Sequence, residues 1–173
     1  MSDIIQPHGG KLVNRLLQGK AREEALLKAR SLKSINVSSR IISDIELIAV
    51  GAFSPIEGFM GKEDYDSVIE NMRLKDGLPW TIPITLPVSE EEAADLEEGE
   101  ELSLVDQDGN IIAILILEEK YLYDKEREAK NVYGTSDLAH PGVSVLYSQG
   151  SVLLGGKISL INRPQNVEFP RYA

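Results

Sequence analysis

The sequence predicts an α+β fold built on a mixed sheet. Short strand-like segments are interleaved with short helix-like segments, without the regular strand–helix rhythm of a doubly wound fold. The clearest element is a hairpin, in which residues 101–106 and 111–119 flank the turn Gln-Asp-Gly-Asn. Apolar residues make up 42% of the chain and charged residues 27%, as is typical of soluble chains that fold around a core. The length of 173 residues predicts a single domain over 1–173.

Residues 1–40 are expected to form a helical segment packed on this domain. Pro-His-Gly-Gly at 7–10 predicts a turn, and Leu12, Val13, Leu16 and Leu17 follow it at roughly helical spacing. Residues 20–33 are strong helix formers with charged flanks and predict a helix. Residues 34–42, which are polar and β-branched, predict a strand or an extended connection.

Two capping-box patterns predict helix starts. Ser43 with Glu46 opens a short helix that the next glycine, Gly51, ends, and Ser89 with Glu92 opens an acidic helix that ends before residue 99. Residues 51–61 contain three further breaks after Gly51, at Pro55 and two glycines, so no helix continues there.

The remaining elements follow from periodicity and from turn residues. Residues 64–72 predict a helix with one apolar face, and residues 124–134 predict a charged helix that Gly134 ends. Residues 81–88 read as a strand that two prolines confine to a sheet edge or a sheet end. Residues 142–149 and 151–161 predict two more strands, with Gly155-Gly156 marking a bulge or a close backbone approach. The apolar face of the 64–72 helix is Tyr65, Val68, Ile69 and Met72.

Charge is unevenly distributed along the chain. The formal net charge is −10, yet residues 1–40 hold eight Lys and Arg against three Asp and Glu. Residues 41–173 hold ten against twenty-five, with a dense acidic run at 90–101. This balance argues against general nucleic-acid binding, because phosphate contacts need clustered Lys and Arg. The basic segment either faces an anionic ligand or an acidic partner, or is simply a solvated helix surface.

Several kinds of chemistry are excluded by composition. The chain has no cysteine, so disulfides, thiolate metal sites and a cysteine nucleophile are ruled out. No apolar run approaches the ~18 residues of a membrane span, and no signal peptide is evident. We therefore expect a cytoplasmic protein without a membrane partner.

The residues on their own show no active site. No P-loop string occurs, and Ser54 is followed by Pro55, which has no N–H for an oxyanion hole. The only two histidines, His8 and His140, sit in Pro-Gly neighbourhoods that favour structural turns. We therefore predict no catalytic, cofactor-binding or metal-ligating residue in this chain.

Five segments carry a further signal when they are taken in order: 7–15, 38–60, 72–88, 133–143 and 153–158. Together they resemble the N-terminal part of ATP sulfurylase (sulfate adenylyltransferase). The resemblance implies a reaction of ATP (with Mg) and sulfate that yields adenosine 5′-phosphosulfate and pyrophosphate, as in sulfate assimilation. It also implies that this part is a PUA-like pseudobarrel, followed in a full-length, homo-oligomeric enzyme by a nucleotide-binding α/β domain.

The catalytic motifs of that family are missing from this sequence. They are a Gln-x-Arg-Asn stretch and a His-x-x-His-type pair, and neither string occurs here. Charge neutralisation at the transferring group needs such residues at fixed positions. The chain alone is therefore predicted to be inactive, either as a truncated chain or as one piece of a split enzyme. Its expected partner is the catalytic domain, in cis or in trans.

The loop at 51–60 is the candidate contact for that partner. It carries Phe53, Ile56, Phe59 and Met60 in a segment too broken by glycine and proline to bury them in a regular element. The alternative is that these side chains fill the domain's own core.

Two other function classes remain open. A PUA-like shape also serves RNA-binding modules, although the acidity of residues 41–173 argues against that use. The chain also fits a stand-alone subunit that regulates or assembles a catalytic chain.

Overall fold

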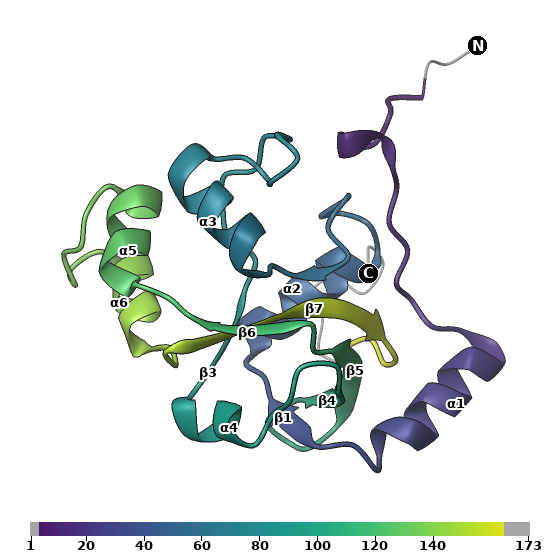
Figure 1. The fold of residues 1–173 in the computed structure, drawn as a ribbon. Coiled ribbons are helices and arrows are strands. Elements are labelled where there is room, and N and C mark those ends of the chain that lie inside the picture. Colours follow the sequence, from purple (N-terminus) through teal and green to yellow (C-terminus); the bar gives the residue numbers. More distant parts are fainter. Residues whose placement is uncertain (1–3, 165–173) are drawn as a thin grey trace. The chain divides into compact units, whose positions relative to one another are not determined.

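The structure is a computed structural model that describes residues 4–164. Contacts divide the chain into two compact units. The first unit comprises Met1–Gly58, Glu101–Ile116 and Ile158–Ala173, and the second comprises Phe59–Glu100 and Leu117–Lys157. Both contain short helices and strands, which are labelled in Figure 1. The expected α+β class is confirmed, whereas one domain over 1–173 stays a prediction.

The first unit holds a mixed sheet. β1 runs parallel to β4, and β4 pairs antiparallel with β5, which pairs antiparallel with the end of β7. β5 lies between two neighbours and is buried over Ile112–Leu115, as its two apolar faces predict. The elements are η1 (His8–Gly10), α1 (Gly19–Ala29), β1 (Ser34–Asn36), α2 (Ser39–Ala49), β4 (Glu101–Val105), β5 (Ile111–Ile116) and the end of β7 (Val152–Leu160).

In the second unit, β3 and β6 both pair antiparallel with the earlier residues of β7. Pro87 lies in β3, which pairs with β7, in keeping with the edge position predicted for this proline-containing strand. The elements are α3 (Lys62–Asn71), β3 (Leu86–Val88), α4 (Glu90–Ala94), β6 (Glu119–Leu122), α5 (Lys125–Tyr133) and α6 (Pro141–Ser148); β2 (Gly58–Phe59) begins in the first unit and ends in the second.

Several helix boundaries follow the predicted signals. Ser89 and Glu92 form a complete capping box at the start of α4. The Asp124 side chain accepts hydrogen bonds from the first backbone N–H groups of α5, and Gly134 ends that helix in the left-handed conformation, with φ of 72°.

The start predicted for α2 is wrong. The helix begins at Ser39, and Ser38 is its N-cap, with Oγ accepting a hydrogen bond from the Ile41 N–H at 3.4 Å. Ser43 lies inside the helix and donates to the Ser39 carbonyl at 3.1 Å. Residues 39–42 are therefore not extended, because Ile41, Ile45 and Ile48 form one buried helical stripe that outweighs their β propensity.

The strand predicted at 142–149 is also wrong, because residues 142–148 belong to α6. His140 is the N-cap, and its Nδ1 accepts a hydrogen bond from the Gly142 N–H at 3.1 Å. Pro141 occupies the first helical turn, where its missing N–H costs nothing. Val143 and Leu146, three residues apart, are the buried positions of this helix.

Two details of the predicted helices also need correction. Residues 11–18 are extended rather than helical, and Leu16 forms a parallel bridge with Leu160. Among the described residues of 1–40, α1 is the one complete α-helix, and α2 begins at Ser39. Met72 does not join the apolar face of α3, because it is the left-handed C-cap and is 56% exposed.

Each unit has its own apolar cluster. In the first, α1 and β5 contribute Ala29 and Ile114, which pack with Ile161. In the second, α5 and α6 contribute Ala129, Val143 and Leu146, and the two helices lie side by side in Figure 1. The predicted close approach at Gly155 is confirmed: a Cβ there would lie 2.8 Å from the Met60 carbonyl oxygen.

Candidate functional site

The four residues predicted for a contact surface differ in their surroundings. Ile56, Phe59 and Met60 are buried within this chain, whereas Phe53 is half-buried. These three side chains therefore fill the chain's own core. Phe53 is the member of the set that retains exposed surface, and its role in binding a partner stays a prediction.

Phe53 lies among other exposed apolar residues of the first unit. α2 ends at Ala49, and the chain turns at Gly51, whose φ is +87°. A Cβ on Gly51 would lie 2.8 Å from Leu12 Cδ1, and the Phe53 N–H donates to the Leu47 carbonyl at 3.2 Å. Leu12, Leu47, Val50 and Phe53 thus surround one turn. We call these four residues the Gly51 surface.

The loop that carries Phe53 is held in place by Ser54. Its Oγ accepts a hydrogen bond from the Val13 N–H at 2.9 Å and donates to the Gly51 carbonyl at 2.6 Å. Ser54 is 5% exposed. A hydroxyl with both bonds made to backbone groups is a structural anchor, in agreement with the exclusion of Ser54 as a nucleophile.

The basic side chains of the N-terminal segment are engaged in structural contacts. Arg15 Nε donates to the Ile158 carbonyl at 2.8 Å, and Arg22 Nε donates to the Ile161 carbonyl at 2.9 Å. Lys11 pairs with Glu57, and Lys28 pairs with Glu101. The local positive charge of residues 1–40 is thus partly balanced by acidic residues from later in the first unit.

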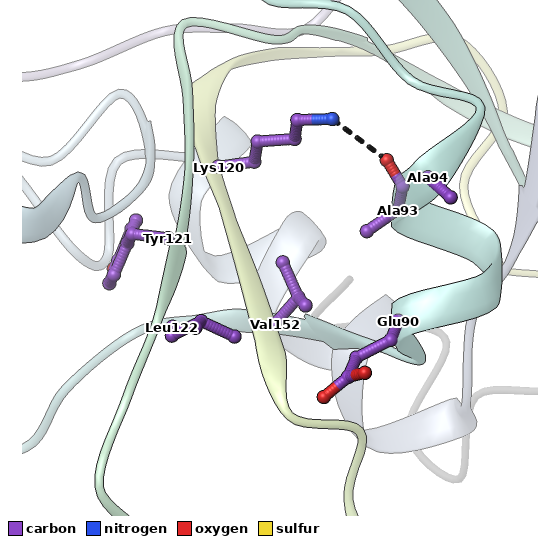
Figure 2. A pocket seen from close by; sticks show the side chains of 7 residues that line it. All are labelled: Glu90, Ala93, Ala94, Lys120, Tyr121, Leu122 and Val152. Atoms are coloured by element: carbon purple, nitrogen blue, oxygen red, sulfur yellow. Dashed lines mark hydrogen bonds between the residues drawn. The ribbon is translucent and has the colours of Figure 1, made fainter.

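The second unit contains a pocket of about 300 Å³ beside α4 and β6 (Figure 2). Lys120 Nζ, on its wall, donates to the Ala93 and Leu96 carbonyls at 3.0 and 2.7 Å, and so caps the C-terminus of α4. The Tyr121 hydroxyl donates to the Met60 carbonyl at 2.7 Å. The third polar side chain of the lining is Glu90, whose carboxylate accepts a hydrogen bond from Ser151 Oγ at 3.4 Å. The polar groups of the lining are thus engaged within this chain. Its lining is Glu90, Ala93, Ala94, Lys120, Tyr121, Leu122 and Val152.

A buried carboxylate in the second unit was missed by sequence reasoning. Glu128, on α5, is 7% exposed and is hydrogen-bonded to the hydroxyl of Tyr65 on α3. Burial, together with the Glu128 charge, raises the pKa of Tyr65 above its usual range. The Tyr65 ring lies 5.8 Å from that of Tyr121 and 6.1 Å from that of Tyr123. This cluster joins α3, α5 and β6. Its one carboxylate sits inside a run of charged residues, which is why the sequence indicated only a charged helix at 124–134.

The two histidines have different neighbours. His140 caps α6, and its ring packs against that of Tyr133 in a tilted arrangement with 5.0 Å between the ring centroids, in the structural role predicted for it. His8 lies in η1.

Over residues 4–164, no group of three or more His, Cys, Asp or Glu side chains is placed to hold a metal ion. None of the helices in that range is both long enough and apolar enough to cross a bilayer.

The fold and these structural contacts agree with the comparison to known families. The profile of a PUA-like domain matches residues 5–163, and the chain belongs to this PUA-like domain family. The predicted PUA-like fold is therefore confirmed.

The curated relatives are more specific. The chain is 54% identical to the sulfate adenylyltransferase of Nostoc punctiforme over 170 residues, which are 98% of this chain and 43% of the relative. It is 50% identical to that of a Synechococcus species, with the same coverage, and 49% identical to that of Symbiobacterium thermophilum, over 95% of this chain and 42% of the relative. The chain matches the N-terminal part of these relatives and spans less than half their length.

A solved structure shares the fold. It is described as a hexameric APS kinase from Thiobacillus denitrificans, and it superimposes with a TM-score of 0.73 at 28% sequence identity. The match covers 98% of this chain and 29% of that one, so here too this fold is one part of a longer protein.

Proposed function

We propose that this chain is the N-terminal, non-catalytic domain of a sulfate adenylyltransferase and acts as a scaffold for the catalytic domain. The observation that carries the proposal is the match of 98% of this chain to 43% of a relative of that name at 54% identity. In the whole enzyme, ATP and sulfate react to give adenosine 5′-phosphosulfate and pyrophosphate. The remaining part of the enzyme supplies the residues that bind both substrates.

The contacts of the basic side chains support a non-catalytic role. A nucleotidyl transfer needs positive groups aimed at the phosphoryl oxygens. Arg15, Arg22 and Lys120 instead donate to backbone carbonyls of this chain. Redirecting any of them to a ligand would leave those carbonyl oxygens without their donors, which costs free energy where the oxygens are buried.

The partner in this proposal is the catalytic domain, joined in cis as in the longer relatives. The structural neighbour is described as hexameric, which supports an oligomeric whole enzyme. Because the reaction consumes ATP, we place that enzyme in the cytoplasm.

A chimera tests the proposal. This chain replaces the matched part of the Nostoc punctiforme relative, and sulfate-dependent pyrophosphate release from ATP is measured. We expect a folded chimera to retain activity within about tenfold of the parent, because the two matched parts are 54% identical. A folded chimera with no activity would contradict the proposed function.

A further inference from the structure

The side chains of the Gly51 surface are more exposed to solvent than the side chains of a protein core. Leu12 is 68% exposed, Val50 40% and Leu47 37%, and Phe53 is half-buried. Single exposed apolar residues are ordinary on a protein surface, but four around one turn form a patch. Lys11, next to Leu12, pairs with Glu57 at 3.4 Å and provides a charged rim. An apolar centre with a polar rim is typical of a protein–protein interface.

The backbone beneath this surface is fixed before any partner binds. The Arg15 N–H donates to the Ala49 carbonyl at 2.9 Å, and Ser54 joins the Gly51 turn to Val13. A Cβ on Gly51 would lie 2.5 Å from the Val13 carbonyl oxygen, so the two backbone segments are closely packed. A preformed surface loses little conformational entropy when it binds a partner.

The end of β7 lies close to the end of α2. The Arg15 N–H donates to the Ala49 carbonyl, and the Leu160 N–H donates to the Arg15 carbonyl, each at 2.9 Å. Backbone segments joined by such hydrogen bonds lie about 4.8 Å apart in a sheet. Two of these spacings in succession place Leu160 within roughly 10 Å of the end of α2. In the longer relatives, the part that follows the match is joined to this domain through the segment after β7, and this covalent link raises its effective concentration at the Gly51 surface.

We propose that the Gly51 surface is where the catalytic part of the sulfate adenylyltransferase chain docks on this domain. The inference rests on the proposed function. It assigns the contact to Leu12, Leu47, Val50 and Phe53, in place of the buried Ile56, Phe59 and Met60. The part that docks presents an apolar face to the Gly51 surface. It belongs to the same polypeptide and is neither a second copy of this chain nor a different protein.

Carbene footprinting of the free chain and of the Nostoc chimera tests this assignment, because it reports side-chain exposure whether or not the chimera is active. We expect labelling at the Gly51 surface to fall at least ~5-fold in the chimera, as for residues that enter an interface core. Leu27 and Leu122, which are 65% and 68% exposed, serve as references. Equal labelling of the Gly51 surface in the two proteins would overturn the assignment. Protection that appears in the free chain as its concentration rises would also overturn it, in favour of a second copy.

A pair of double variants tests the energetic role of the surface. L12Q/L47Q and the matched control L27Q/L122Q each replace two exposed leucines, so both free chains should keep their Tm within about 2 °C. In the chimera, we expect L12Q/L47Q alone to restore labelling of Val50 and Phe53. If both pairs restore it, or neither does, the proposed surface is wrong. An inactive parent chimera in which the Gly51 surface is protected would instead count against the proposed function alone.

Discussion

Phe53 and Phe59 illustrate how far one residue's surroundings decide its role. Both lie in the loop predicted to bind a partner, but Phe59 is 3% exposed and Phe53 is half-buried. Removing a buried aromatic side chain costs about 3–5 kcal/mol, because the transfer free energy is lost and a cavity is left behind. We therefore expect Phe59→Ser to lower the Tm of the free chain by roughly 10 °C and Phe53→Ser to change it little. Equal losses in thermal unfolding would place both residues in the core.

The Tyr65–Glu128 hydrogen bond is a second test at this level. Tyr65 is 2% exposed, and Tyr65→Phe removes a donor from the buried Glu128 carboxylate. Leaving such a group with one fewer partner costs about 1–3 kcal/mol. Urea unfolding should show this loss for Tyr65→Phe, whereas the control Glu118→Gln, at an exposed position, should stay within about 0.5 kcal/mol of the parent. A neutral Tyr65→Phe variant would mean that solvent reaches Glu128.

Among the secondary elements, α2 allows a direct comparison of two serines. Ser38 accepts a hydrogen bond from the Ile41 N–H as N-cap, whereas Ser43 donates to a carbonyl inside the helix. Ser38→Ala should cost about 1 kcal/mol, because a backbone N–H loses its acceptor. Ser43→Ala should be neutral or slightly stabilising, because alanine is the better helix former. The reverse order in chemical denaturation would restore Ser43 as the cap.

The contact between α3 and α5 predicts an acid sensitivity. Burial raises the pKa of Asp66, but hydrogen bonds and charges from Lys62 and Arg127 outweigh it and hold the pKa below its ordinary value of 3.8. A carboxyl with a lowered folded-state pKa adds stability above its unfolded pKa, and that stability is lost as the pH falls through the folded value. The Tm gap between the parent and Asp66→Asn should thus be widest above pH ~5 and close below pH ~3. The exposed Asp108→Asn should show no such gap; if the Asp66 gap does not depend on pH, the ion pair is not its source.

The sequence predicted those elements whose signals are local. The Asp-Gly hairpin, the Ser89–Glu92 capping box and the stop at Gly134 each depend on a few neighbouring residues, and all three are present. The misassigned elements carried competing signals. In α6, alternating Val143, Val145 and Tyr147 suggested a strand, but the His140 cap and Pro141 start a helix. For α2, the β-branched residues at 41–42 obscured a helical stripe.

The candidate site was only partly predictable. The loop at 51–60 was found from its broken pattern, but which of its side chains stay exposed depends on long-range packing. Leu12 joins the Gly51 surface from about forty residues away in the sequence, through the bond between the Val13 N–H and Ser54. Leu47 lies in a helix whose start was misplaced, and Val50 is the C-cap of that helix. No local signal links these positions.

For the molecule as a whole, we propose that the chain supports catalysis without performing it. Sulfate-dependent pyrophosphate release from ATP, measured on the folded chain alone and on the Nostoc chimera, tests this claim most directly. We expect no release above background by the chain alone and clear release by the chimera. Release by the chain alone would mean that it holds an active site of its own, and would contradict the assignment of a scaffolding role.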